Sequence, residues 1–126
     1  MEKNTFFLEK AEEELARAEE YLDIDMCDDG LVFFHLKNSA ENYLKAIAQE
    51  FNLDTEKFSS LTEIVEELEK KTTIKFPEFI DYIKEMDETI LSTGCSTNIC
   101  FDMDFYGDFY EAVNSLKEFA LKLLEE

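Results

Sequence analysis

Apolar residues recur at three- and four-residue steps along most of the chain, which is the spacing of one helix face. The pattern predicts four long helices and one shorter helix, at Thr5–Leu22, Leu31–Phe51, Leu61–Lys71 and Pro77–Leu91 and from about Asp108 onward. Three glycines and one proline are few enough for long helices, and no segment alternates like a strand. We therefore expect an all-α fold, an antiparallel up-and-down helical bundle, in one domain spanning residues 1–126.

The apolar stripes also predict the core and some helix ends. Thr5 and Ser60 are placed to cap the first and third helices, and Glu63 follows Ser60 at the spacing of a capping box. In the second helix the stripe comprises Val32, Phe33, Leu36, Ala40, Tyr43, Leu44, Ile47 and Phe51. These side chains are expected to pack against the other helices.

Acidic residues dominate the charge of this 126-residue chain. Its 31 acidic and 12 basic residues give a formal net charge of −19. Proteins bind phosphate backbones chiefly through Lys and Arg, and this sequence has one arginine, Arg17, and no basic block. Non-specific nucleic-acid binding is therefore not expected.

The sequence also bears on location. No apolar run approaches the roughly 20 residues that cross a bilayer, and the N-terminal residues contain no apolar stretch typical of a signal peptide. Three cysteines, Cys27, Cys95 and Cys100, are an odd number and suggest reduced thiols. We expect a cytoplasmic protein without a membrane partner.

Two acidic segments resemble calcium loops at first sight. Asp25 and Asp102 each begin a segment with glycine at the sixth position, but the twelfth positions are Leu36 and Val113 instead of glutamate. The cysteines lack the Cys-x-x-Cys spacing of zinc sites. We therefore expect no metal and no cofactor. We interpret Ser92–Gly107 as a long irregular loop, and its length makes it a candidate site for a ligand.

The second helix carries a polar row beside its apolar stripe. The row comprises His35, which is the single histidine of the chain, together with Asn38, Glu41, Asn42 and Lys45. Glu41 and Lys45 are four residues apart in the order that favours an ion pair. This pattern fits either a solvated helix side or the edge of a binding or subunit-contact site.

Three segments resemble the HEPN family, the "higher eukaryotes and prokaryotes nucleotide-binding" domain. They are FLEKAEEEL at Phe7–Leu15, FHLKNSAENYLKA at Phe34–Ala46 and LTEIVEEL at Leu61–Leu68. Ser39 and Asn42 depart from the family pattern of the second segment. The resemblance implies a helical bundle that often forms homodimers, and residues of the second segment that mix core packing with interface.

Many HEPN proteins are metal-independent ribonucleases with an Arg-x4-6-His motif near the last long helix. The corresponding region here, Gly94–Asp108, contains neither arginine nor histidine. Other family members partner nucleotidyltransferases in toxin–antitoxin-like or regulatory systems, or bind nucleotides or other small ligands. We therefore expect a homodimeric, non-catalytic partner module with no catalytic residue.

Two alternatives remain open. The first is a divergent HEPN ribonuclease that uses His35 to move a proton. The second is a sensor of a nucleotide or other small ligand. An RNA-cleavage assay separates the first alternative from a binding role, and a ligand screen by thermal unfolding addresses the second.

Overall fold

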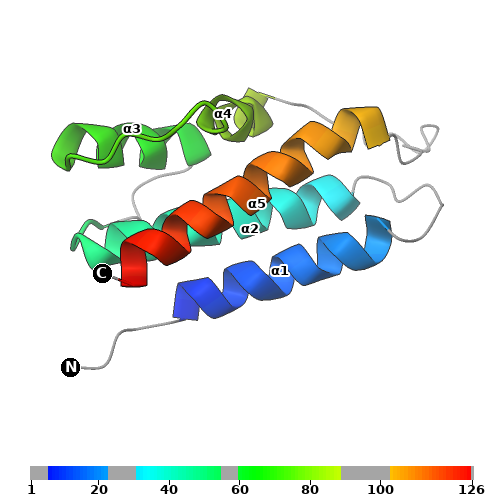
Figure 1. The fold of residues 1–126 in the computed structure, drawn as a ribbon, viewed down its shortest axis with the longest axis horizontal. Helices are drawn as coiled ribbons and strands as arrows, with labels where there is room; N and C mark the ends of the chain where they lie inside the picture. Colours follow the sequence, from blue (N-terminus) through cyan, green and yellow to red (C-terminus); the bar gives the residue numbers. More distant parts are fainter. Residues whose placement is uncertain (1–5, 23–30, 55–59, 89–102, 126) are drawn as a thin grey trace.

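Five helices make up most of the computed structural model, which describes residues 6–22, 31–54, 60–88 and 103–125 (Figure 1). They are α1 (Phe6–Leu22), α2 (Leu31–Glu50), α3 (Leu61–Lys71), α4 (Ile80–Glu88) and α5 (Met103–Glu125). The described residues contain no strand. The predicted all-α helical fold is therefore confirmed.

Helix α2 lies at the centre and contacts all four other helices. Helix α1 packs along α2, and no other described helix approaches its backbone closely. α3 and α4 lie on the side of α2 away from α1, with α5 beside α2 and α4 (Figure 1). The α1–α2 interface is therefore the main contact that holds α1 in place.

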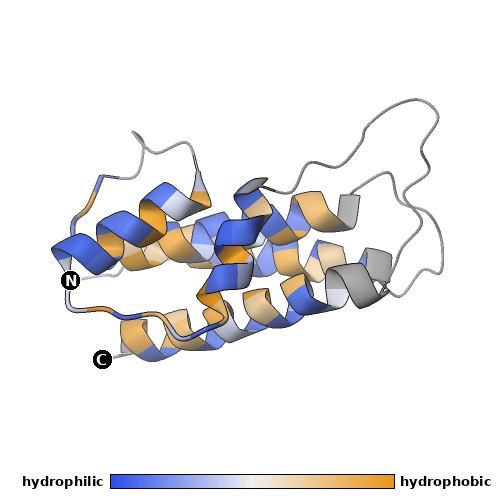
Figure 2. Cartoon of the chain, turned by 90° about the horizontal axis from the view of Figure 1, so that it is seen from above, coloured by the Kyte–Doolittle hydropathy of each residue, from blue (hydrophilic) through white to orange (hydrophobic). Residues whose placement is uncertain are grey.

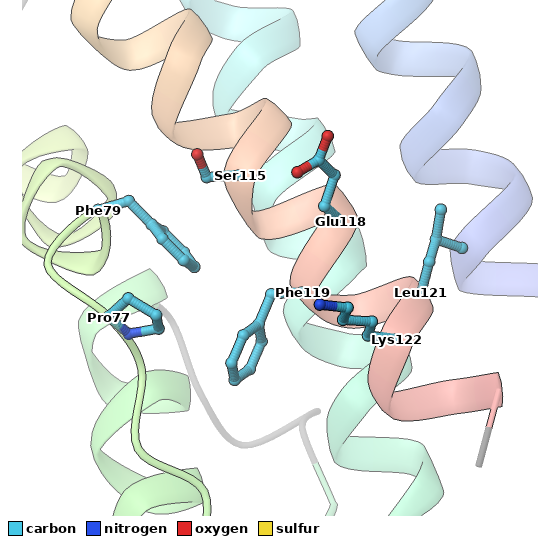
Figure 3. A pocket seen from close by; sticks show the side chains of 7 residues that line it. All are labelled: Pro77, Phe79, Ser115, Glu118, Phe119, Leu121 and Lys122. Atoms are coloured by element: carbon cyan, nitrogen blue, oxygen red, sulfur yellow. The ribbon is translucent and has the colours of Figure 1, made fainter.

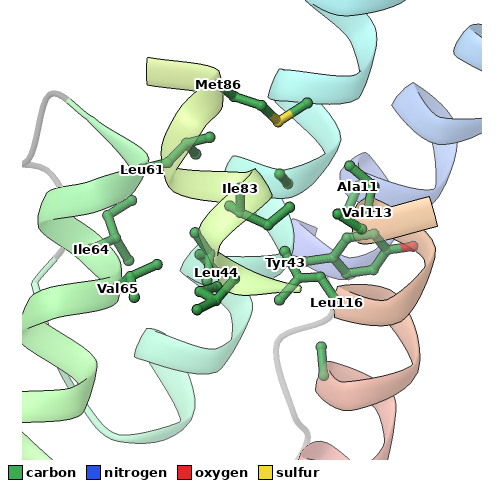
Figure 4. Close-up of a cluster of buried hydrophobic side chains, with 14 of the residues drawn as sticks. Ala11, Tyr43, Leu44, Leu61, Ile64, Val65, Ile83, Met86, Val113 and Leu116 are labelled. Carbon is green, nitrogen blue, oxygen red and sulfur yellow. The ribbon is translucent and has the colours of Figure 1, made fainter. Parts of the chain in front are cut away.

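The core is one cluster of apolar side chains from all five helices. Each helix has hydrophobic and hydrophilic sides, as the spacing predicts (Figure 2). Tyr43 and Leu44 of α2 lie at the middle of the cluster (Figure 4). The largest fully buried side chains are Tyr43, Leu36, Leu44, Ile47, Leu61, Ile64, Leu68, Ile83, Met86 and Leu116.

Two capping arrangements hold the N-terminus of α3. The backbone N–H of Glu63 donates to Ser60 Oγ at 3.2 Å, which confirms Ser60 as the N-cap. Asp87 of α4 also accepts the N–H groups of Leu61 and Thr62, at 3.0 and 2.6 Å. One carboxylate thus satisfies two donors of α3 and fixes α3 against α4.

The end of α2 differs from the prediction at Phe51. This side chain is 40% exposed, although the apolar stripe placed it in the core. Asn52 has a left-handed φ of 59°, its N–H donates to the Gln49 carbonyl, and the Leu53 N–H donates to the Ala48 carbonyl. This is a Schellman ending, which turns the chain after Glu50 and carries Phe51 away from the stripe.

The bounds of α5 and α4 also differ from the prediction. Met103–Gly107 belong to α5, although the sequence prediction assigned them to the irregular segment 92–107. A glycine inside a helix costs only about 1 kcal/mol, so the long apolar stripe that follows outweighs it. α4 begins at Ile80, and Pro77 precedes it in a turn where the Ile80 N–H donates to the Pro77 carbonyl.

Some predictions fall outside the described residues. They concern Thr5 as a cap, the segment 23–30, the segment 92–102 and the three cysteines. In the described part of the chain, no helix combines the length and the apolar character that a membrane crossing requires.

Candidate functional site

His35, the single histidine, lies in the seam between α2 and α1. Its Nδ1 is 2.6 Å from Oε2 of Glu14, and the two side chains are only 13% and 11% exposed. An ionised carboxylate only accepts hydrogen bonds, so His35 carries a proton on Nδ1 when Glu14 is ionised. The imidazole thus serves as a donor that ties α2 to α1.

Two neighbouring contacts continue this seam. One turn along α2, the buried Ser39 donates from Oγ to the carbonyl of Ala11 at 2.8 Å. On α1, Lys10 Nζ lies 4.0 Å from Oε1 of Glu14. Glu14 therefore meets a positive charge on one oxygen and His35 on the other, which offsets the cost of burying a carboxylate.

The other predicted site residues follow the same side of α2 without converging on one point. Asn42 donates from Nδ2 to the Asn38 carbonyl at 2.8 Å, within the helix. Glu41 and Lys45 form the predicted ion pair at 3.8 Å. The Lys45 ammonium also lies 6.0 Å from the centroid of the Phe7 ring on α1. These residues therefore form a line along α2.

An exposed aromatic ring stands at the start of this line. Phe34 is 56% exposed, and its ring meets the His35 ring edge-on at a centroid distance of 5.3 Å. Phe34, Asn38, Glu41 and Lys45 occupy one side of α2 by the helical period, and we call them the α2 row. An apolar ring with amide and charged groups beside it is typical of a protein contact surface.

Arg17, the single arginine, is engaged on α1. Its guanidinium lies 3.6 Å from the Glu13 carboxylate, and both side chains are more than half exposed. The arginine and histidine that a ribonuclease of this type requires are thus each paired with a separate glutamate. Among the described residues, no group of three or more His, Cys, Asp or Glu side chains could hold a metal.

Tyr43 is a polar residue that the sequence placed correctly in the core, although its hydroxyl group is unusual there. The side chain is fully buried near Ala11 and Val113 (Figure 4). Its hydroxyl has no hydrogen-bond partner among the described residues. Burial, and then the negative charges of Glu12 and Glu19, raise the pKa of Tyr43 above its usual value of 10.0.

Sequence reasoning missed Glu14 and Asp87. Neither was singled out, since nothing in a list of 31 acidic residues distinguishes these two. Glu14 does fall between the apolar positions Ala11, Leu15 and Ala18 of α1, and that position was the available signal. Asp87 has no local signal, because its contacts are 25 and 26 residues away along the chain.

Comparison with protein families agrees with the resemblance seen in the sequence. The chain matches the family described as the HEPN domain over residues 5–124. Comparisons with curated proteins and with solved structures found no significant match.

Proposed function

This chain belongs to the HEPN domain family, and from this premise we propose that it is a non-catalytic member that works by binding other protein chains. Membership suggests a nucleotide-binding or ribonuclease-type module. The observation that carries the proposal is the 2.6 Å contact between His35 Nδ1 and Glu14 Oε2. It gives the single histidine a role in holding α1 on α2.

The chemistry of RNA cleavage supports the same conclusion. A ribonuclease of this family needs an arginine to steady the phosphate charge and a histidine nearby to move a proton. Arg17 and His35 are the single residues of each type, and they do not have the Arg-x4-6-His spacing. The net charge of −19 also opposes the approach of RNA.

We assign the binding role to the α2 row. Phe34 supplies an exposed apolar anchor, while Asn38, Glu41 and Lys45 supply polar contacts that can align a second chain. We infer that the α2 row binds a second copy of this chain, so that two α2 rows meet in a symmetric homodimer. A nucleotidyltransferase is the second partner, bound by the resulting dimer.

A pair of matched variants tests the homodimer. Light scattering after size-exclusion chromatography should give the dimer mass for the wild type and a monomer mass for Phe34→Glu. Tyr82→Glu is the control, because Tyr82 of α4 is also an exposed aromatic, at 43%, and the charge change is the same. A monomeric wild type, or equal effects of the two variants, would argue against the α2 row.

Two further measurements test the partner and the alternative activity. Purified chain should retain a nucleotidyltransferase encoded beside it, and Phe34→Glu should retain less of it. In an RNA-cleavage assay, we expect no activity from the wild type. Activity that His35→Ala abolishes would replace this proposal by the divergent ribonuclease.

A further inference from the structure

A groove separates the turn before α4 from the C-terminal half of α5. Its volume is about 510 Å³, within the range of small-molecule sites (Figure 3). Pro77 and Phe79 line it from the turn, and Phe119 and Leu121 line it from α5. It shares no residue with the α2 row, so its role is separate from the proposed protein contact.

The floor of this groove is aromatic and held in place. The Phe119 ring contacts the rings of Phe76 and Phe79, at centroid distances of 5.0 and 6.0 Å. All three side chains are partly buried against the core. Such a floor offers a flat apolar molecule a ring surface that need not reorganise on binding.

One positive charge stands at the edge of the groove. Lys122 is exposed and makes no ion pair with the described residues. Its side chain extends toward Phe119, while the Glu118 carboxylate points away from that ring (Figure 3). Lys122 thus places beside the aromatic floor a cation that has no counter-ion among the described residues.

We propose that this groove binds a flat apolar molecule with one negative charge, of the class of aromatic carboxylates. The ring lies against Phe119 and Phe79, and the carboxylate pairs with the ammonium of Lys122. The net charge of −19 repels anions at long range, but salt screens that field beyond about 8 Å at physiological ionic strength. The contact with Lys122 therefore decides the preferred charge of the ligand.

Three probes with one ring system and different charges test this site. Naphthoate, naphthol and naphthylmethylamine are negative, neutral and positive at neutral pH, and NMR amide shifts report their binding to the whole chain. Naphthoate should bind most tightly and shift the amides of Phe79, Phe119 and Lys122. Absence of binding, shifts elsewhere on the molecule, or stronger binding of naphthylmethylamine would overturn the proposal.

Lysine variants on α5 then isolate the charge. Lys122→Gln should weaken naphthoate binding roughly twofold to fivefold, the range of an exposed ion pair, and leave naphthol binding unchanged. Lys117→Gln is the control, since Lys117 is on the same helix and does not line the groove. Equal effects of the two variants would remove Lys122 from the site. Thermal unfolding checks that both variants remain folded.

Discussion

Glu14 of α1 and His35 of α2 share a hydrogen bond of 2.6 Å between Oε2 and Nδ1, and both side chains are almost fully buried between the two helices. Their neighbours in the seam are Ser39 and Ala11, which are joined by a second buried hydrogen bond. Because α2 is the one described helix whose backbone α1 approaches closely, these polar contacts fix the register of α1. The histidine is thereby part of the fold, and this is why we assign it no catalytic role.

The first prediction concerns this contact. His35→Ala leaves the Glu14 carboxylate buried with only the long Lys10 contact, so we expect the free energy of unfolding to fall by about 1–3 kcal/mol. Glu13→Gln removes the exposed pair with Arg17 and should cost less than about 0.5 kcal/mol. Urea unfolding measures both values. Equal losses would show that the seam contact does not stabilise the docking of α1.

The features of this fold that could be predicted from the sequence are those set by residues close together along the chain. In α3 the cap Ser60 and the four apolar residues Leu61, Ile64, Val65 and Leu68 all behave as their spacing indicates. Each of these features depends on residues within one or two turns of each other. The same is true of the Glu41–Lys45 ion pair in the predicted polar row. A single sequence contains such information directly.

Features that depend on contacts between distant parts of the chain were harder to predict from the sequence. Phe51 fits the apolar period, but the left-handed Asn52 ends α2 first and exposes it. Glu14 and Asp87 have the same chemistry as surface acids, and only the approach of α2 and α3 distinguishes them. The groove beside Phe119 likewise forms where α5 meets the turn before α4. Sequence periodicity contains no information about such meeting points.

A second prediction follows from the buried Tyr43 hydroxyl. Its lack of a partner among the described residues means that Tyr43→Phe removes a desolvated polar group and breaks no hydrogen bond. We expect the free energy of unfolding to stay unchanged or to rise by up to about 2 kcal/mol. Tyr110→Phe is the contrast, because the Tyr110 hydroxyl donates to Glu19 at 2.8 Å, and we expect a small loss. A loss above about 1 kcal/mol in Tyr43→Phe would contradict the assignment.

A third prediction concerns alkaline pH. In the folded chain, burial and the charges of Glu12 and Glu19 raise the pKa of Tyr43, whereas in the unfolded chain it ionises near its usual value of 10.0. The contribution of Tyr43 to stability is therefore complete below pH 10.0 and declines as the pH rises above it. Relative to Tyr43→Phe, the wild type should lose roughly 1.4 kcal/mol per pH unit there. Parallel pH profiles of the two proteins in urea unfolding would disprove this.

A fourth prediction concerns the tie between α4 and α3. Asp87 accepts hydrogen bonds from the Leu61 N–H and from both the N–H and the hydroxyl of Thr62, and it lies 3.8 Å from Lys37 of α2. Asp87→Ala removes all of these, so we expect a loss of about 1–3 kcal/mol in urea unfolding. Asp81→Ala removes an exposed acid of the same helix and should cost less than about 1 kcal/mol.

The outcome for Asp87 also separates its two roles. Asp87→Asn keeps an oxygen that accepts from α3 but loses the charge that attracts Lys37. We expect an intermediate loss, closer to the wild type than to Asp87→Ala. If Asp87→Asn is as unstable as Asp87→Ala, the ion pair with Lys37 outweighs the helix cap.

The fifth prediction concerns Gly107, which lies inside α5 although the sequence pattern placed the start of this helix near Asp108. A Cβ built at this position meets no described atom within 4 Å, and its backbone is helical. Gly107→Ala should therefore raise the free energy of unfolding by about 0.5–1 kcal/mol, because alanine has less conformational freedom to lose on folding. Ala16→Gly, at an exposed interior position of α1, should lower it by about 1 kcal/mol. Urea unfolding of both variants checks the pair. A stability loss in Gly107→Ala would show that α5 begins after this residue, since only there would the glycine be needed.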